Sequence, residues 1–177
     1  TEDIMEEVGY VDENGQKFFK ADETYQKIAA VERHKNTGKV GVGIVKGFGL
    51  RGGAIASSVS HDSHNLIVIG DNDHDMCLAV QELLRTQGGY TLIENGKVFD
   101  TLPLPVMGLM SDAGYEQVNE KLTRMIPKAH EMGIPQGFDP FITLSFMALP
   151  VIPQIRITPR GIYLTQEDRM IQSPFDR

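Results

Sequence analysis

The stretch Ala54-Ile55-Ala56-Ser57-Ser58-Val59-Ser60-His61-Asp62-Ser63-His64-Asn65-Leu66-Ile67-Val68-Ile69 consists of two apolar runs around a polar centre. Its ends, residues 54–57 and 65–69, have the length and the small or branched side chains that are typical of strands. The nine residues 57–65 contain a single apolar side chain, Val59. Residues 65–69 are apolar on both faces, which predicts a central strand covered by helices on both sides. The stretch therefore indicates a layered α/β or α+β domain.

Turn residues predict several further strands. Asn95-Gly96 supplies two residues suited to positive φ, which predicts a type I′ hairpin between residues 90–94 and 97–101. The other predicted strands are residues 17–20 after a tight turn, residues 25–33 (with a helix as the alternative), residues 40–45, and a closing hairpin of residues 154–158 and 162–164. We therefore expect a single domain with a mixed β-sheet that contains β-hairpins and is covered by a few helices.

Two helices are predicted between these strands. Asn72 or Asp73 can cap the first, and Ser111 or Asp112 can cap the second, in which Pro127 predicts a kink or a break. Residues 141–149 form an apolar element of undetermined type. The apolar positions of the second helix are Tyr115, Val118, Leu122, Met125, Ala129 and Met132, and we expect Cys77, Met107, Met110, Met125 and Met132 to fill gaps in the core.

A length of 177 residues fits one domain with a sizeable core. We divide the chain into an extension or remnant of a preceding segment (1–24), the principal domain (25–165) and a solvated tail (166–177). The chain starts at Thr1 rather than Met, so both a piece of something longer and a processed first residue are open.

Composition excludes several classes of function. The 24 acidic residues outnumber the 17 basic residues, giving a net charge of -7 that disfavours nucleic acid and anionic membranes as partners. Cys77 is the only cysteine, so no intrachain disulfide can form, and a cytoplasmic location is expected. The longest apolar stretch, residues 138–152, contains two prolines and is too short to span a membrane.

The polar centre of the opening stretch is the candidate site, because imidazole, carboxylate, hydroxyl and amide groups there can bind a polar ligand. An elaborate turn is the structural alternative. A metal site is weakly supported, since His61 and His64 can share a ligand face only on a helix or in a curled loop, and neighbours in sequence do not usually converge as a catalytic triad. We therefore assign no catalytic residue and no metal ligand. The candidate binding residues are Ser60, His61, Asp62, Ser63, His64 and Asn65.

The glycine-rich run at residues 41–53 has neither dinucleotide-loop nor phosphate-loop spacing, and a strand follows it rather than a helix. We expect these glycines to serve close packing.

Five motifs together give the chain a family resemblance that extends over nearly all of it from about residue 25. They are Val31-Glu32-Arg33-His34; Gly43-x-Val45-Lys46-Gly47-Phe48-Gly49-Leu50; residues 53–65 from Gly53 to Asn65; Leu102-Pro103-Leu104-Pro105 with Gly108-Leu109-Met110-Ser111-Asp112; and Thr143-Leu144-Ser145-Phe146-x-Ala148-Leu149-Pro150-Val151-Ile152-Pro153. With these motifs the chain resembles the C-terminal domain of bacterial-type adenine deaminase, of the amidohydrolase superfamily.

This resemblance implies a purine-salvage hydrolase that converts adenine and water to hypoxanthine and ammonia, with a binuclear manganese or iron centre. Members of that superfamily hold the metals in a β/α-barrel that begins with a His-x-His pair. This sequence has no His-x-His and no eightfold βα pattern, so it contains no TIM barrel. We expect the isolated chain to bind no metal cofactor and to be inactive.

The expected partners are the enzyme's own catalytic barrel domain, adenine and further copies in a homo-oligomer. We hypothesise that residues 60–65 dock at the barrel mouth and complete the purine site. The alternative is a structural or oligomerisation module without a direct role in catalysis.

Overall fold

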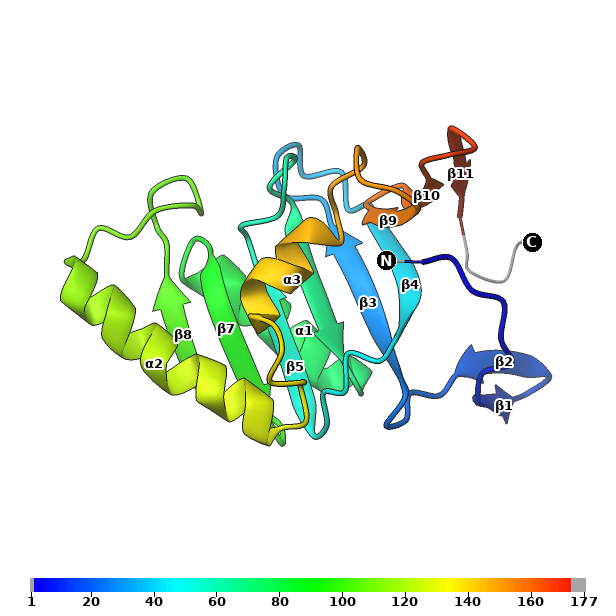
Figure 1. Cartoon of the computed structure of the whole chain (residues 1–177), viewed down its shortest axis with the longest axis horizontal. Helices are drawn as coiled ribbons and strands as arrows, with labels where there is room; N and C mark the ends of the chain where they lie inside the picture. Colours follow the sequence, from blue (N-terminus) through cyan, green and yellow to red (C-terminus); the bar gives the residue numbers. More distant parts are fainter. Residues whose placement is uncertain (1, 173–177) are drawn as a thin grey trace.

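A six-stranded sheet with the order β4-β3-β6-β5-β7-β8 forms the centre of the fold (Figure 1). The computed structural model describes residues 2–172. The fold class is confirmed, but every strand pair of this sheet is antiparallel, so the expected mixed sheet is wrong in its strand directions. Its strands are β3 (Tyr25–Val31), β4 (Val40–Lys46), β5 (Gly53–Ser57), β6 (Leu66–Gly70), β7 (Gly89–Glu94) and β8 (Lys97–Pro103).

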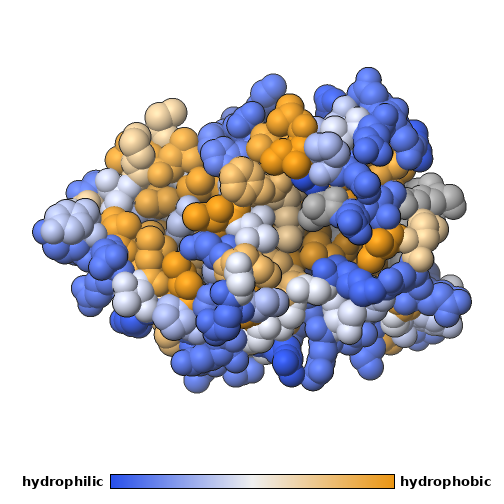
Figure 2. Space-filling view, viewed as in Figure 1, coloured by the Kyte–Doolittle hydropathy of each residue, from blue (hydrophilic) through white to orange (hydrophobic). Residues whose placement is uncertain are grey.

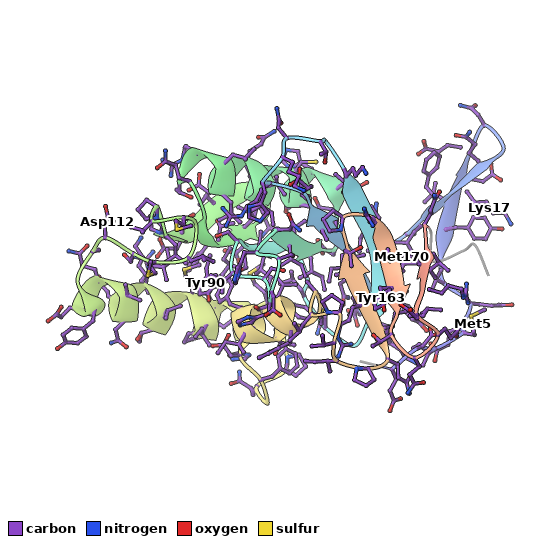
Figure 3. All side chains as sticks on the ribbon, turned by 90° about the horizontal axis from the view of Figure 1, so that it is seen from above. Met5, Lys17, Tyr90, Asp112, Tyr163 and Met170 are labelled. Carbon is purple, nitrogen blue, oxygen red and sulfur yellow. The ribbon has the colours of Figure 1, made fainter. Side chains whose placement is uncertain are left out.

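The two faces of this sheet carry side chains of different size. Ile55, Ile67 and Ile69 point to one face, which is covered by α2 (Tyr115–Glu131) and α3 (Pro140–Phe146). Ala54 and Ala56 point to the other face, where α1 (Asp73–Arg85) lies. Figure 3 shows α1 on the side of the sheet opposite α2 and α3. Burial of β6 on both faces confirms the predicted central strand.

Two smaller sheets flank the central one. The hairpin of β1 (Tyr10–Glu13) and β2 (Gln16–Phe19) stands beside it, and β9 (Ile155–Thr158), β10 (Gly161–Leu164) and β11 (Arg169–Ile171) form a three-stranded antiparallel sheet (Figure 1). The closing hairpin is confirmed. Within the predicted solvated tail, β11 pairs with β10, and its last residue, Ile171, is only 4% exposed.

The glycines of β4 allow this three-stranded sheet to pack closely. A Cβ on Gly41 would collide with the carbonyl of Thr158, and one on Gly43 would lie 3.4 Å from Ile162. The packing role predicted for the glycine-rich run is confirmed for these two positions.

Local sequence signals located most elements. Residues 25–31 form a strand rather than the alternative helix. Asn95 and Gly96 have φ of 48° and 76° between β7 and β8, as the predicted hairpin requires. Asn72 caps α1 by accepting a hydrogen bond from the Asp75 N–H at 2.8 Å.

The second helix differs from its prediction. It begins at Tyr115 after Gly114, and neither Ser111 nor Asp112 caps it. The Ser111 hydroxyl instead accepts a hydrogen bond from the Ala113 N–H within the preceding turn. The helix continues through Pro127 without a break. The undetermined apolar element after it is helical (α3), with Asp139 as its cap.

Several apolar side chains expected in the core lie on the surface. Met125 and Met132 are buried, but Cys77 is exposed, and Tyr115, Met107 and Met110 are 79%, 76% and 56% exposed. Among residues 2–172, no helix combines the length and the apolar character that crossing a membrane requires.

Candidate functional site

The candidate residues lie in the β5–β6 loop (residues 58–65), at the edge of the central sheet where the strands β3, β5 and β8 end. Val31 at the end of β3 pairs with Leu66, and Ser57 at the end of β5 pairs with Ile67. Pro103 at the end of β8 pairs with Gly89 at the same edge. The connections that follow these strands therefore meet around the β5–β6 loop.

The base of the loop is buried and hydrogen-bonded. Ser58 Oγ donates to the Gly108 carbonyl at 2.6 Å and accepts from the Gly89 N–H at 2.8 Å. Both contacts join the loop to the strand β7 and to the segment after β8. Ser58 is fully buried, so its hydroxyl holds the loop in place rather than facing a ligand.

His61 is the imidazole that the loop presents outward. Its side chain is 44% exposed and stacks on Phe146 at the end of α3, with ring centroids 5.4 Å apart. The His61 N–H also donates to Ser145 Oγ at 3.3 Å. Asp62 is 82% exposed, with a carboxylate oxygen 3.7 Å from His61 Nδ1. Contacts with α3 thus fix the direction of an accessible imidazole ring.

His64 has different contacts. Its φ is 50°, its N–H donates to the Ser60 carbonyl at 2.6 Å, and its Nδ1 is buried without a hydrogen-bond partner among residues 2–172. Burial lowers the pKa of His64, and the nearby charges of His61 and Arg33 lower it further. The protein therefore disfavours protonation of His64, and its Nδ1 lies on the buried side of the ring.

Arg33 connects three segments of this edge. Its N–H donates to Asn65 Oδ1 at 3.3 Å, its Nε donates to the His64 carbonyl, and its Nη2 donates to the Met107 carbonyl at 2.8 Å. Gly108 makes room for the guanidinium, because a Cβ there would lie 2.5 Å from Arg33 Nη1. Burial lowers the pKa of Arg33, although an arginine stays charged at any physiological pH.

The β3–β4 connection is ordered by Glu32 and contacts the β5–β6 loop through His34. Glu32 accepts hydrogen bonds from the N–H groups of His34, Lys35 and Thr37, and the bond from Thr37 contributes most to lowering its pKa to about 2. This arrangement places His34 Nε2 2.6 Å from the Ser63 carbonyl.

The structure therefore assembles a site larger than the sequence segment. All six predicted residues lie together, and Arg33, His34, Ser145 and Phe146 join them from other segments. Sequence spacing did not group His34 with the histidines of the β5–β6 loop. The one available signal was that residues 31–34 and 143–146 belong to the motifs of the family resemblance.

The two histidine rings of the loop are neighbours. The rings of His61 and His64 are 5.8 Å apart and tilted by 57°. Within residues 2–172, no group of three histidine, cysteine or carboxylate side chains is arranged to hold an ion. What the loop offers is an accessible imidazole with an adjacent carboxylate, which suits hydrogen bonding to a polar ligand.

Comparison with known proteins defines the class of this chain. The family model for the adenine deaminase C-terminal domain matches residues 1–169, so the chain belongs to that family, and the resemblance is confirmed. The match includes residues 1–24, and the division of the chain at residue 24 stays a prediction.

Individual relatives give the same assignment. The chain is 58% identical over 148 residues to an adenine deaminase of Desulfitobacterium hafniense, covering 84% of this chain and 26% of the relative. It is 56% identical over 138 residues to an adenine deaminase of Nitratidesulfovibrio vulgaris (77% of this chain, 24% of the relative) and 51% identical over 137 residues to that of Bacillus subtilis (77% and 24%). The chain thus spans about a quarter of the length of these relatives.

Proposed function

We propose that this chain is the C-terminal domain of a metal-dependent adenine deaminase and that its β5–β6 loop completes the purine site of a separate barrel domain. Membership of the family and the names of the relatives support the reaction, which converts adenine and water to hypoxanthine and ammonia. The binuclear manganese or iron centre belongs to the barrel in this proposal, where it supplies the activation of the attacking water. The enzyme acts in the cytoplasm, in purine salvage, as a homo-oligomer.

The observation that carries the proposal is the orientation of His61. Asn65 is already engaged, because its Oδ1 accepts from Arg33 and its Nδ2 donates to Ser63 Oγ. His64 Nδ1 is buried. The side chain of His61 is 44% exposed, and an imidazole can donate to or accept from the ring nitrogens and amino group of adenine.

His61 is placed on a fixed support, as a binding group requires. Phe146 holds one face of its ring and Ser145 binds its backbone, while Arg33 fixes the far end of the loop. Such contacts reduce the conformational freedom that the side chain would lose on binding. The chain's own contribution is then to orient the purine or the attacking water through one hydrogen bond.

The proposal is tested by comparing the chain alone with the same chain joined to the rest of a related enzyme. The chain alone, and a chimaera in which it replaces the matching region of the Desulfitobacterium hafniense adenine deaminase, are assayed for adenine deamination with added manganese, and their metal content is measured. We expect turnover and bound metal from the chimaera and neither from the chain alone. Deamination by the chain alone, or an inactive but folded chimaera, would contradict the proposal.

The alternative is a structural or oligomerisation module. It is favoured by the exposed apolar side chains Met107, Met110 and Tyr115, which a partner surface can cover. Under this alternative, substitutions in the loop lower thermal stability before they lower turnover.

A further inference from the structure

A group of apolar side chains is exposed beside His61. Figure 2 shows apolar side chains gathered over the segment after β8 and over α3, on the face that carries α2 and α3. We call this group the loop-side apolar surface. It consists of Val106, Met107, Met110, Ile142 and Phe146, which are 41%, 76%, 56%, 54% and 44% exposed.

The parts of this surface are linked through the β5–β6 loop. Ile142 and Phe146 are four residues apart on α3 and so lie on one helix face. Phe146 stacks on His61, and the His61 and His64 rings are 5.8 Å apart. Arg33 then connects the His64 carbonyl to the Met107 carbonyl. The two groups of apolar side chains, after β8 and on α3, are therefore both linked to the polar loop through these contacts.

The fold does not explain why position 107 carries a methionine side chain. Its φ is 60°, in the left-handed region that favours glycine, asparagine or aspartate, and its side chain is 76% exposed. Methionine there neither relieves the backbone nor contributes to the core. A contact with another surface gives such a side chain a function, because exposed, flexible methionines adapt well to binding partners.

We propose that the loop-side apolar surface is the docking surface for the catalytic domain of the deaminase, an inference that rests on the proposed function. The chain spans only 26% of the length of the Desulfitobacterium hafniense relative, so a larger part of that enzyme remains to cover it. A second copy seated on the same surface would cover His61 and separate it from a purine site. Docking of the catalytic domain instead places His61 at the border between the two domains.

Methionine oxidation tests this directly, because hydrogen peroxide converts accessible methionines to sulfoxides that mass spectrometry locates. The chain alone and the chimaera are oxidised side by side, and rates are compared for Met107 and Met110. Met170, 38% exposed on β11, serves as the internal reference. We expect Met107 and Met110 to react at least tenfold more slowly in the chimaera than in the chain alone, with Met170 changed less than twofold.

Equal rates in the two contexts would overturn the proposal. So would protection in the chain alone that rises with concentration together with dimer formation in sedimentation, because a second copy would then be the occupant. Slow oxidation of Met107 in the chimaera with full activity of a His61→Ala variant would retain the docking surface and reject the role of the loop. The failures of the two proposals are therefore distinguishable.

Substitutions give an independent readout. Met107→Asp combined with Ile142→Asp adds charge to the surface, and aspartate tolerates the positive φ at position 107. In the chimaera we expect Met110 to recover the oxidation rate of the chain alone. The control is Leu84→Asp, which places the same charge at a 63% exposed position of α1 on the other face and leaves Met110 protected. Protected Met110 in the double variant would contradict the proposal.

Discussion

Two connections between neighbouring antiparallel strands lie at opposite ends of the strands of the central sheet and are built in different ways. The β7–β8 turn needs only Asn95 and Gly96, whose positive φ values reverse the chain locally. The β5–β6 loop is held by Arg33, Ser145 and Gly108, which come from three other segments. A turn that only reverses the chain can be local, whereas a loop that presents His61 in one direction needs support from outside.

The largest difference between the two connections is expected from matched glycine substitutions. A Cβ on Gly88 would lie 2.5 Å from Gly108 Cα and 2.8 Å from Ser58 Oγ, at φ of 112°. A Cβ on Gly96, at φ of 76°, would meet nothing closer than His74 at 3.6 Å. Gly88→Ala should therefore cost about 3 kcal/mol of unfolding free energy, from strain plus overpacking, and Gly96→Ala only about 1 kcal/mol from strain. Urea denaturation measures both, and equal costs would show that the packing under the loop is not tight.

Removal of the buried hydroxyl should have the next largest effect. Ser58→Ala leaves the Gly89 N–H and the Gly108 carbonyl without the hydroxyl that binds both. We expect a loss of about 2 kcal/mol in the free energy of unfolding. Ser63→Ala, at an exposed position of the same loop, removes only the hydroxyl that accepts from Asn65 Nδ2 and should cost no more than about 1 kcal/mol. A cost for Ser58→Ala as small as that of the control would contradict the anchoring role.

The pH dependence of stability should report the partly buried ring of His64, which is faced by His61, Asp62, His34 and Arg33. Its folded pKa lies below the unfolded value of 6.5. The unfolded state thus binds more protons as the pH falls through 6.5, so stability is lost on acidification and regained above it. His64→Asn removes the titrating group, and asparagine tolerates the positive φ.

Unfolding free energies at pH 7.5 and 5.5 check this prediction. Between pH 7.5 and pH 5.5, the free energy of unfolding of the parent chain should fall more than that of the His64→Asn variant. An identical loss in both chains would mean that His64 is not buried as described.

The smallest expected effect is local and concerns Glu32. Its pKa of about 2 lies below the ordinary value of 4.5, so the stabilisation of residues 32–39 is present above 4.5 and is lost as the pH falls through about 2. Amide chemical shifts of His34, Lys35 and Thr37 should therefore titrate together with a midpoint near 2. A midpoint near 4.5 would show that Glu32 does not bind these amides in solution.

The elements that depend on neighbours in sequence were predictable. Asn95-Gly96 located a hairpin, and the apolar run of β6 located a central strand, because both signals act within a few residues. Strand directions were not predictable, since covering helices are compatible with parallel and antiparallel pairing. The start of α2 was also mispredicted, because Ser111 is a good cap by type but its hydroxyl is used in a tighter turn.

The site was predictable only where neighbours in the sequence determine it. The density of polar groups identified residues 60–65, but their orientations depend on tertiary contacts that spacing does not encode. His61 and His64 are chemically identical in the sequence, but in the fold the ring of His61 stacks on Phe146, whereas Nδ1 of His64 is buried. Met107 and Met110 were assigned to the core by residue type and lie on the surface.

The central claim is that the β5–β6 loop acts in the purine site through His61. The most direct measurement is kcat/KM for adenine in the chimaera with His61→Ala, followed together with Tm and metal content, and with His74→Ala on the remote helix α1 as the control. We predict a loss of about a hundredfold for His61→Ala with Tm and metal content unchanged, and no loss for the control. Unchanged kcat/KM in the His61→Ala variant would contradict the claim.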